Sequence, residues 1–374
     1  MQIGIEHIHH YYFFIYSISS TFESMSELFM PFNTSIIVIA TTRYEQGRHE
    51  AKRWLELNQN LRHIASNPYN IIAANNRYDQ EYVKYFTGID NVMLLPSYCG
   101  YVTARYNPKK KEFLLAPARG VNGKIAASLQ QHTKQYNTKL CSGCKTINII
   151  PIRELYPYFQ YDDIVNHPAI VIIPYQISFM SFFEFYRMEI PMFVPSPELL
   201  TEWHLTMNAI SERTWATVLG WPVGQSAISR HPNSTSSILS DPNNEYSREA
   251  ILEWIKLADF YTVDHVITFT SWDHLLTLLQ TTDLRSISKR MKEYSTTVLN
   301  ELEKNWDIVL DRVRQGINTK RFGDGNKYYE HSKNSTDIDN YCNMPSSIND
   351  ALNNSTGLLL RNRCTGNKKR DSLN

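Results

Sequence analysis

Short apolar runs alternate with amphipathic stretches over residues 35–107 of this chain. Ser35–Thr41 is a β-branched run of the kind that forms a buried parallel strand. Residues 48–64 then repeat apolar side chains near helical spacing, and residues 70–95 continue the pattern as strand, helix and strand. Because strands that are separated by helical crossovers pair in parallel, this region predicts a parallel sheet.

A second alternation begins after the charged turn Asn107–Lys111. It predicts helices over residues 124–136 and 178–188 between short apolar runs. We therefore expect an α/β protein with two Rossmann-like parallel-sheet lobes, residues 1–107 and 108–315, and a cleft between them. The strands predicted for the second lobe are Glu112–Ala116, Thr146–Ile152, Ala169–Ile173 and Ile190–Val194.

The last part of the second lobe reads as mainly helical. Residues 199–219 and 248–260 are expected to form helices, and residues 286–313 carry a long amphipathic pattern. Beyond Gln315 the apolar residues thin out, and Asn, Ser, Gly and charged residues dominate. Residues 316–374 are therefore predicted to be a disordered tail.

Composition and charge exclude several classes of protein. The chain has 374 residues, of which 42% are hydrophobic and 20% charged, as expected for a globular protein and not for a disordered or collagen-like one. Lys and Arg number 38 against 37 Asp and Glu, so no overall field draws the protein to nucleic acid. The apolar stretch Tyr11–Ile18 is too short to span a membrane and follows no basic segment.

The cysteines form no disulfide framework, because five are scattered through a long chain. Cys141 and Cys144 make a CxxC pair, which raises zinc and redox interpretations. Zinc needs two further ligands, and no second CxxC or HxxxH follows at the spacing of a zinc finger. A redox site would open a helix after a strand, whereas a strand-like run follows this pair. An inert turn is the favoured interpretation.

The loop after the predicted strand Glu112–Ala116 carries candidates for phosphate binding. Ligands of open parallel sheets bind at the carboxyl ends of strands, and Arg119, Gly120 and Gly123 lie there, before a predicted helix. Free amides at the start of a helix, with a guanidinium nearby, suit a phosphate. Such glycines also occur in ordinary turns, so both interpretations stay open.

The loop after the predicted strand Ala169–Ile173 offers more polar groups. Ser178 is placed to cap the helix that follows, and Ser181 lies one turn further along. Glu184 has phenylalanines about it, where a carboxylate costs free energy unless it is hydrogen-bonded or faces a cleft. Three interpretations stay open for Glu184. It extends to solvent from the edge of the helix, it is a structural partner of Arg187, or it accepts hydrogen bonds from two ribose hydroxyls.

Residues 169–196 resemble the donor-binding half of GT-B glycosyltransferases. The shared order is a strand, Pro-Tyr-Gln-x-Ser, a helix bearing Ser and Glu, then Ile-Pro and another strand. Those enzymes often carry two glutamates eight residues apart at this place, and the second holds the ribose of the nucleotide. Glu184 matches the second position, but Gln176 stands at the first. With the loop at Arg119, the resemblance implies a donor site of Arg119, Gly120, Tyr175, Gln176, Ser178, Ser181 and Glu184.

The resemblance implies a glycosyltransferase that uses a nucleotide-sugar donor, requires no metal or other cofactor, and stabilises the departing diphosphate electrostatically. Residues 1–107 would be its acceptor-side lobe, truncated relative to the family, with the acceptor near Asn76, Tyr78 and Asp79. Asp79 also suits a helix-capping role, so no catalytic base is assigned. The alternatives are a non-catalytic or degenerate nucleotide-sugar-binding protein or partner subunit, and a redox protein built on the CxxC pair.

Overall fold

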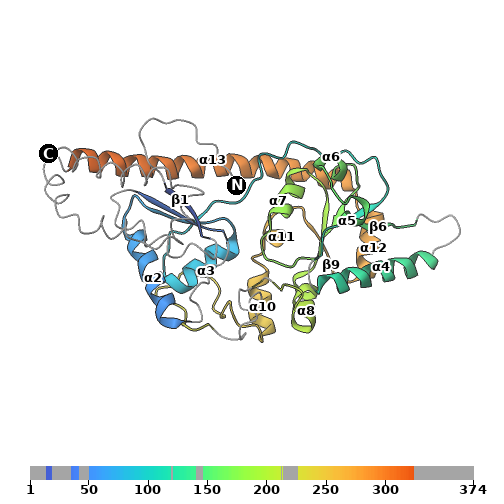
Figure 1. The fold of residues 1–374 in the computed structure, drawn as a ribbon, viewed down its shortest axis with the longest axis horizontal. Coiled ribbons are helices and arrows are strands. Elements are labelled where there is room, and N and C mark those ends of the chain that lie inside the picture. The colour runs from blue at the N-terminus through green and yellow to red at the C-terminus, as the bar shows by residue number, and fades with distance from the viewer. Residues whose placement is uncertain are drawn as a thin grey trace, which may run out of the picture. The chain divides into compact units, whose positions relative to one another are not determined.

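The computed structural model describes residues 14–18, 35–41, 50–118, 121–139, 146–211, 213 and 226–323, and gives only the backbone for 14–18 and for most of 317–323. Met1–Gly316 forms one compact unit that contains two parallel β-sheets with helical crossovers (Figure 1). The predicted α/β class with two parallel-sheet regions is confirmed.

The first sheet has the strand order β1-β2-β3-β4, and every pair in it is parallel. Buried Ile, Val and Ala fill β2 and β3, as expected for strands that are covered on both faces. The first sheet and its helices, called the first lobe below, comprise β1 (Phe14–Ile18), β2 (Ile36–Ala40), α2 (Ala51–Ser66), β3 (Ile71–Ala74), α3 (Arg77–Thr87) and β4 (Met93–Leu94).

The second sheet has the order β6-β5-β7-β8-β9 and is also entirely parallel. The chain passes from β5 outward to β6 and then returns to the other side of β5 for β7, so the strand order reverses between β5 and β7. Such a reversal is the usual ligand-binding point of an open α/β sheet. The strands are β5 (Phe113–Leu115), β6 (Ile149–Pro151), β7 (Ile170–Val171), β8 (Met192–Pro195) and β9 (Ile267–Phe269).

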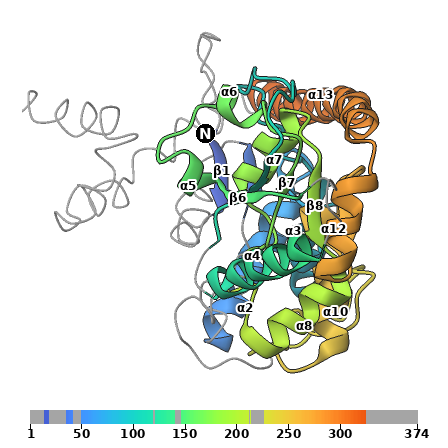
Figure 2. The same cartoon turned by 90° about the vertical axis from the view of Figure 1, so that its right-hand side faces the viewer.

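Helices of the second lobe surround this sheet (Figure 2). Two of them, α4 and α12, lie side by side, and His132 of α4 is 2.8 Å from the Asp273 carboxylate of α12. The helices are α4 (Asn122–Thr138), α5 (Ile152–Leu155), α6 (Tyr161–Ile164), α7 (Met180–Arg187), α8 (Pro197–Met207), α10 (Arg248–Ile255), α11 (Asp259–Thr262), α12 (Trp272–Thr281) and α13 (Leu284–Gly323).

The hydrophobic core is continuous between the two lobes. Trp254 of α10 packs against three tyrosines of α3, with ring centroids 5.0 Å from Tyr78, 6.1 Å from Tyr82 and 5.9 Å from Tyr85. Trp254, Tyr78 and Tyr82 are each at most 1% exposed. Large buried aromatic side chains dominate the energetics of a core, so this cluster joins the lobes firmly.

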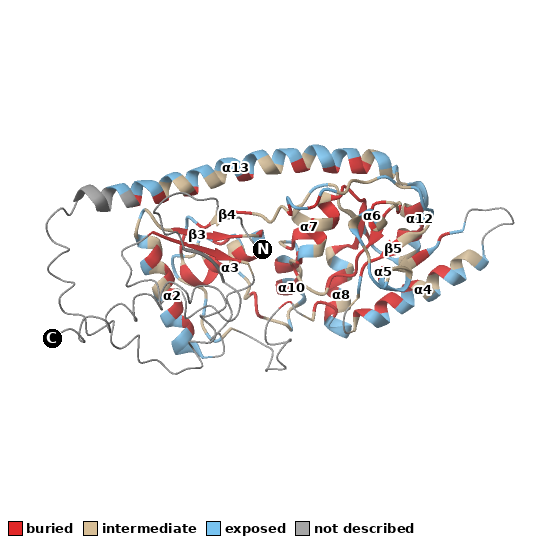
Figure 3. Ribbon diagram, turned by 45° about the horizontal axis from the view of Figure 1, so that its top comes forward, coloured by how far each residue is buried: buried red, intermediate tan, exposed pale blue. Residues whose placement is uncertain are grey.

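The last helix, α13, crosses back to the first lobe. Tyr294 near its start packs edge-on against Tyr186 of α7, whereas Asn305 Nδ2 donates a hydrogen bond to Leu94 O at 3.4 Å. Buried residues recur along the side of the helix that faces the protein, and the opposite side is exposed (Figure 3). The amphipathic pattern in the sequence therefore becomes a helix that contacts both lobes up to Gly316.

Several helix boundaries differ from those predicted. The helix expected over residues 199–219 ends at Met207, because Asn208 takes the left-handed conformation (φ 56). The helix expected over 248–260 breaks into α10 and α11, since Ala258 is extended and Asp259 starts a new turn. Helix α13 continues to Gly323, past the tail boundary expected after Gln315, and residues 324–374 lie outside the described residues. Within the described ranges, no helix is long and apolar enough to cross a membrane.

Candidate functional site

The loops that follow β5 and β7 meet at the point where the strand order reverses. Asn122, the first residue of α4, links them, because its Nδ2 donates to Pro174 O at 3.0 Å and to Ile173 O at 3.4 Å. Asn122 is fully buried, and its Oδ1 has no hydrogen-bond partner among the described residues. Arg119 and Gly120, predicted to contact phosphate, lie outside the described residues.

The loop after β7 differs from the prediction in its capping. The N-cap of α7 is Phe179, with no side-chain cap, so Ser178 does not cap this helix. Tyr175 stacks on the Phe179 ring with 5.8 Å between centroids, and Gln176 is half-buried beside it. Ser181 is half-buried in the first turn of α7. The Ser178 hydroxyl is instead hydrogen-bonded to a carboxyl group of α11.

That carboxyl group belongs to Asp259, the first residue of α11. Its backbone N–H donates to Ile177 O at 3.2 Å, and its side chain is hydrogen-bonded to Ser178. Asp259 is 4% exposed, and its Oδ2 has no hydrogen-bond partner in the described part of the chain. Burial raises the pKa of Asp259 to about 8, the Ser178 hydrogen bond opposes this shift, and the charge of Asp79 adds to it. A buried carboxyl group that titrates near neutral pH is a marker of functional sites.

The three acceptor-side candidates occupy the start of α3. Asn76 is the N-cap, and its Oδ1 accepts from Asp79 N at 2.7 Å while its Nδ2 donates to Asp79 Oδ2 at 2.6 Å. Asp79 is therefore the third residue of the helix, its N–H is capped by Asn76, and a second bond joins the two side chains. Tyr78 is buried against Trp254. The structure brings Asp79 near Asp259, and so near the Ser178 loop.

Glu184 is held by two tyrosines rather than by Arg187. The hydroxyls of Tyr101 and Tyr161 both donate to Glu184 Oε1, at 2.7 and 2.9 Å. Burial and the neighbouring Glu184 raise the pKa of Tyr161 to about 12, so the phenol stays protonated as a donor. Arg187 lies instead over the Tyr98 ring, 4.7 Å from its centroid. The ion pair with Arg187, one of the alternatives that the sequence leaves open for Glu184, is not formed.

A cavity of about 180 Å³ lies between the lobes beside α13. Its wall on the first lobe comes from the segments that follow β3 and β4, including Asn76 and Arg77. Its wall on the second lobe comes from α7 and α11, including Arg187 and Asp259. Of the sequence-predicted site residues that the structure describes, only Asn76 lines this cavity; Ser178 contributes indirectly through its bond to Asp259.

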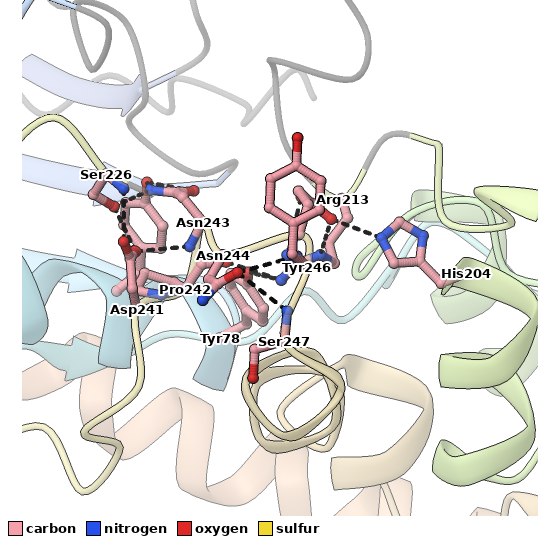
Figure 4. Close-up of polar contacts among 12 residues, drawn as sticks. Tyr78, His204, Arg213, Ser226, Asp241, Pro242, Asn243, Asn244, Tyr246 and Ser247 are labelled. Carbon is pink, nitrogen blue, oxygen red and sulfur yellow. Dashed lines mark hydrogen bonds and ion pairs between the residues drawn. The ribbon is translucent and has the colours of Figure 1, made fainter. Parts of the chain in front are cut away.

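A buried charge network of the second lobe reaches Tyr78 of the first lobe (Figure 4). Arg213, fully buried, pairs with Glu245 at 2.9 Å, and His204 Nε2 lies 2.7 Å from the same carboxylate. Arg213 Nη1 also donates to Pro242 O at 2.9 Å and reaches Tyr78 OH at 3.5 Å. Burial alone would raise the pKa of Glu245, but Arg213 and the His204 hydrogen bond outweigh it and hold that pKa at about 2.

Sequence reasoning missed Asp259 and the Arg213 network. Asp259 stands between Ala258 and Phe260 in an apolar stretch, so the argument that singled out Glu184 applies to it equally. Arg213, Glu245 and His204 are scattered along the chain and carry no such local signal.

No protein-family model matches this chain, and no curated protein does. Among the described residues, no group of three or more His, Cys, Asp and Glu side chains is placed to hold a metal ion, and Cys141 and Cys144 lie outside those residues. The fold and the site thus define an α/β protein with two parallel sheets and a cavity between its lobes.

Proposed function

We propose that this protein is a glycosyltransferase that moves a sugar from a nucleotide-sugar donor to an acceptor bound between its lobes. The observation that carries the proposal is the reversal of strand order between β5 and β7. The loops at that point contain Arg119, Gly120 and Ser178, the residues for which the sequence suggests donor binding. Diphosphates and nucleotides bind at such reversal points in open α/β sheets.

The layout of the lobes also supports this function. A second parallel sheet belongs to the same compact unit, and a cavity lies between the lobes. Helix α13 leaves the second lobe and packs on the first, as the closing helix of a GT-B enzyme does. A transfer reaction needs a donor and an acceptor held together with water excluded, and two apposed lobes provide that geometry.

In this proposal the diphosphate lies on the loop after β5, where Arg119 and backbone amides stabilise the charge that develops on the leaving group. Tyr175, Gln176, Ser178 and Ser181 surround the nucleotide from the loop after β7. Glu184 already accepts two tyrosine hydroxyls at Oε1, so a ribose would use its other oxygen.

The test is a panel of uridine, guanosine and cytidine nucleotide-sugars, measured for binding and for slow hydrolysis without acceptor. We expect one donor class to bind saturably, and Arg119→Gln to weaken it at least tenfold, because a charge-assisted contact is worth about 1.5–3 kcal/mol. Arg153→Gln is the matched control, since Arg153 is an exposed arginine just after the neighbouring strand β6. If no donor binds, or if both variants bind equally, the proposal fails.

The second candidate is a nucleotide-sugar-binding protein without transferase activity. It is favoured by Gln176, which stands where the family often carries the first of its two glutamates, so the sugar-contacting carboxylate is replaced by an amide. The same panel separates the candidates: saturable donor binding without hydrolysis, and without transfer to any sugar acceptor, supports the non-catalytic protein.

A further inference from the structure

Two arginines from opposite lobes line the cavity beside α13. Arg77 is the first residue of α3 in the first lobe, and Arg187 is the last residue of α7 in the second. We propose that this cavity binds an anionic group, a phosphate or a carboxylate, between the guanidinium groups of Arg77 and Arg187. The inference does not depend on the glycosyltransferase proposal.

Neither guanidinium forms an ion pair with any residue that the structure describes. Arg187 stacks on the Tyr98 ring, and its Nε is buried without a hydrogen-bond acceptor among the described residues. A buried N–H that lacks an acceptor costs free energy, so an acceptor supplied by a ligand is favoured there. Arginine presents several N–H groups in a planar fork that matches the oxygens of phosphate and carboxylate groups.

The start of α3 adds to the positive potential at the same wall. Asn76, the N-cap, and Arg77 both line the cavity. The Asn76 side chain accepts from Asp79 N, so among the described residues the cap does not occupy the N–H group of Arg77. The N-terminus of an α-helix carries a partial positive charge and favours anions.

Asp259 is a second, independent indication that the cavity binds a ligand. It is 4% exposed, it lines the cavity, and its Oδ2 has no hydrogen-bond partner in the described ranges. Because burial raises the pKa of Asp259 to about 8, the group is mainly a neutral carboxylic acid at pH 7. In that form it donates a hydrogen bond to an anion.

The other charged groups around Asp259 set the sign of the cavity. Asp79 of α3 lies close enough to affect Asp259, but its carboxylate accepts from Asn76. Glu301 of α13 lines the cavity and is exposed. Among the described residues that line the cavity, Arg77 and Arg187 carry two positive charges against one negative charge on Glu301 while Asp259 is protonated. The lining therefore has a positive excess at neutral pH, and ionisation of Asp259 removes it. Anion binding should therefore weaken as pH rises through about 8.

The volume leaves room for a small ligand. The 180 Å³ of this partly open cavity is several times the ~30 Å³ that one water takes in the liquid, so an inorganic anion or a small organic group fits. A free phosphate and a phosphate ester offer the same oxygens to the arginines. The experiment below separates these sources.

The test titrates the full chain with inorganic phosphate, glycerol phosphate and acetate at constant ionic strength, with binding followed by calorimetry. We expect at least one of these anions to bind saturably at pH 7, and Arg77→Gln and Arg187→Gln each to weaken it about tenfold or more. Arg290→Gln is the control, because Arg290 is an exposed arginine on α13 that does not line the cavity, and it should bind as the wild type does. Tighter binding of glycerol phosphate than of phosphate identifies an ester as the ligand type, and the reverse order identifies the free anion.

A second variant keeps the test decisive if an arginine variant fails to fold. Asp259→Asn cannot ionise, so it should retain anion binding above pH 8, where the wild type loses it. The inference is overturned if none of the three anions binds saturably, or if both arginine variants fold and bind like Arg290→Gln. Anion binding without any nucleotide-sugar binding would leave this inference standing and defeat only the proposed function.

Discussion

Gly316 of α13 lies directly against Tyr69 of the first lobe. A Cβ built on Gly316 would stand 2.7 Å from the Tyr69 Cβ and 2.7 Å from the Ser35 Oγ. Ser35 and Tyr69 precede β2 and β3, so the helix backbone itself docks at the amino ends of the first sheet. Only glycine permits so close an approach, and this contact explains why the last helix can return to the first lobe.

Replacing Gly316 by alanine should therefore destabilise the protein, although alanine is the better helix former. Overpacking costs about 1–3 kcal/mol, which exceeds the gain of about 1 kcal/mol in helix propensity. Gly123→Ala is the control, because no described residue lies within 4 Å of a Cβ added to Gly123 in α4. Urea unfolding should show Gly316→Ala below the wild type and Gly123→Ala level with it or slightly above. Equal midpoints for the two variants would contradict the docking.

Removing the charge of Glu245 should cost more than removing an exposed one. Glu245→Gln leaves the fully buried Arg213 uncompensated, and breaking a buried pair costs about 3–5 kcal/mol. Glu202→Gln removes the partner of Arg248 in a half-exposed pair, where we expect less than about 1 kcal/mol. Chemical denaturation of both variants measures the contrast. A loss for Glu245→Gln no larger than that for Glu202→Gln would show that the network does not stabilise the lobes.

The free energy of unfolding should depend on pH through the titration of Asp259. Its pKa is raised from 3.8 to about 8 on folding, so between these values the folded chain keeps a proton that the unfolded chain has released. The stability that this group contributes is therefore fully present below about pH 4 and is lost as pH rises to about 8, by at most about 1.4 kcal/mol per pH unit.

Thermal unfolding from pH 5 to pH 9 checks this against Asp259→Asn, which lacks the titrating group. The stability of the wild type should fall with pH relative to that of the variant. Asp307→Asn, an exposed change on α13, should follow the wild type at every pH. Parallel curves for Asp259→Asn and the wild type would mean that Asp259 is ionised throughout.

The two tyrosine hydroxyls that donate to Glu184 predict that Tyr161→Phe lowers the free energy of unfolding. The lost hydrogen bond goes to a charged acceptor in a half-buried place, so we expect about 1.5 kcal/mol. Tyr158→Phe changes a ring that is 94% exposed three residues earlier and should be neutral. If Glu184 also holds a ribose, Glu184→Gln should weaken donor binding about tenfold, whereas a purely structural Glu184 should affect stability alone. Equal stability of Tyr161→Phe and Tyr158→Phe would show that the Tyr161 hydrogen bond to Glu184 does not stabilise the protein.

Local patterning determined the class of fold. The β-branched run at residues 35–41 and the apolar run at 169–173 correspond to β2 and β7, because strands covered on both faces need continuous apolar side chains. Gly88 ends α3, since the left-handed conformation that it takes there (φ 70) favours glycine. These features depend on neighbours along the chain, and the sequence displays them directly.

Tertiary structure decided the roles of the polar residues. Ser178 has the pattern of a cap but bonds to Asp259, which is 81 residues away, and Glu184 bonds to Tyr101 rather than to nearby Arg187. Both side chains could have satisfied a local partner, and only the folded chain shows which acceptor or donor is within reach. A hydrogen bond requires atoms about 3 Å apart, and the sequence does not contain the distance between segments that are remote along the chain.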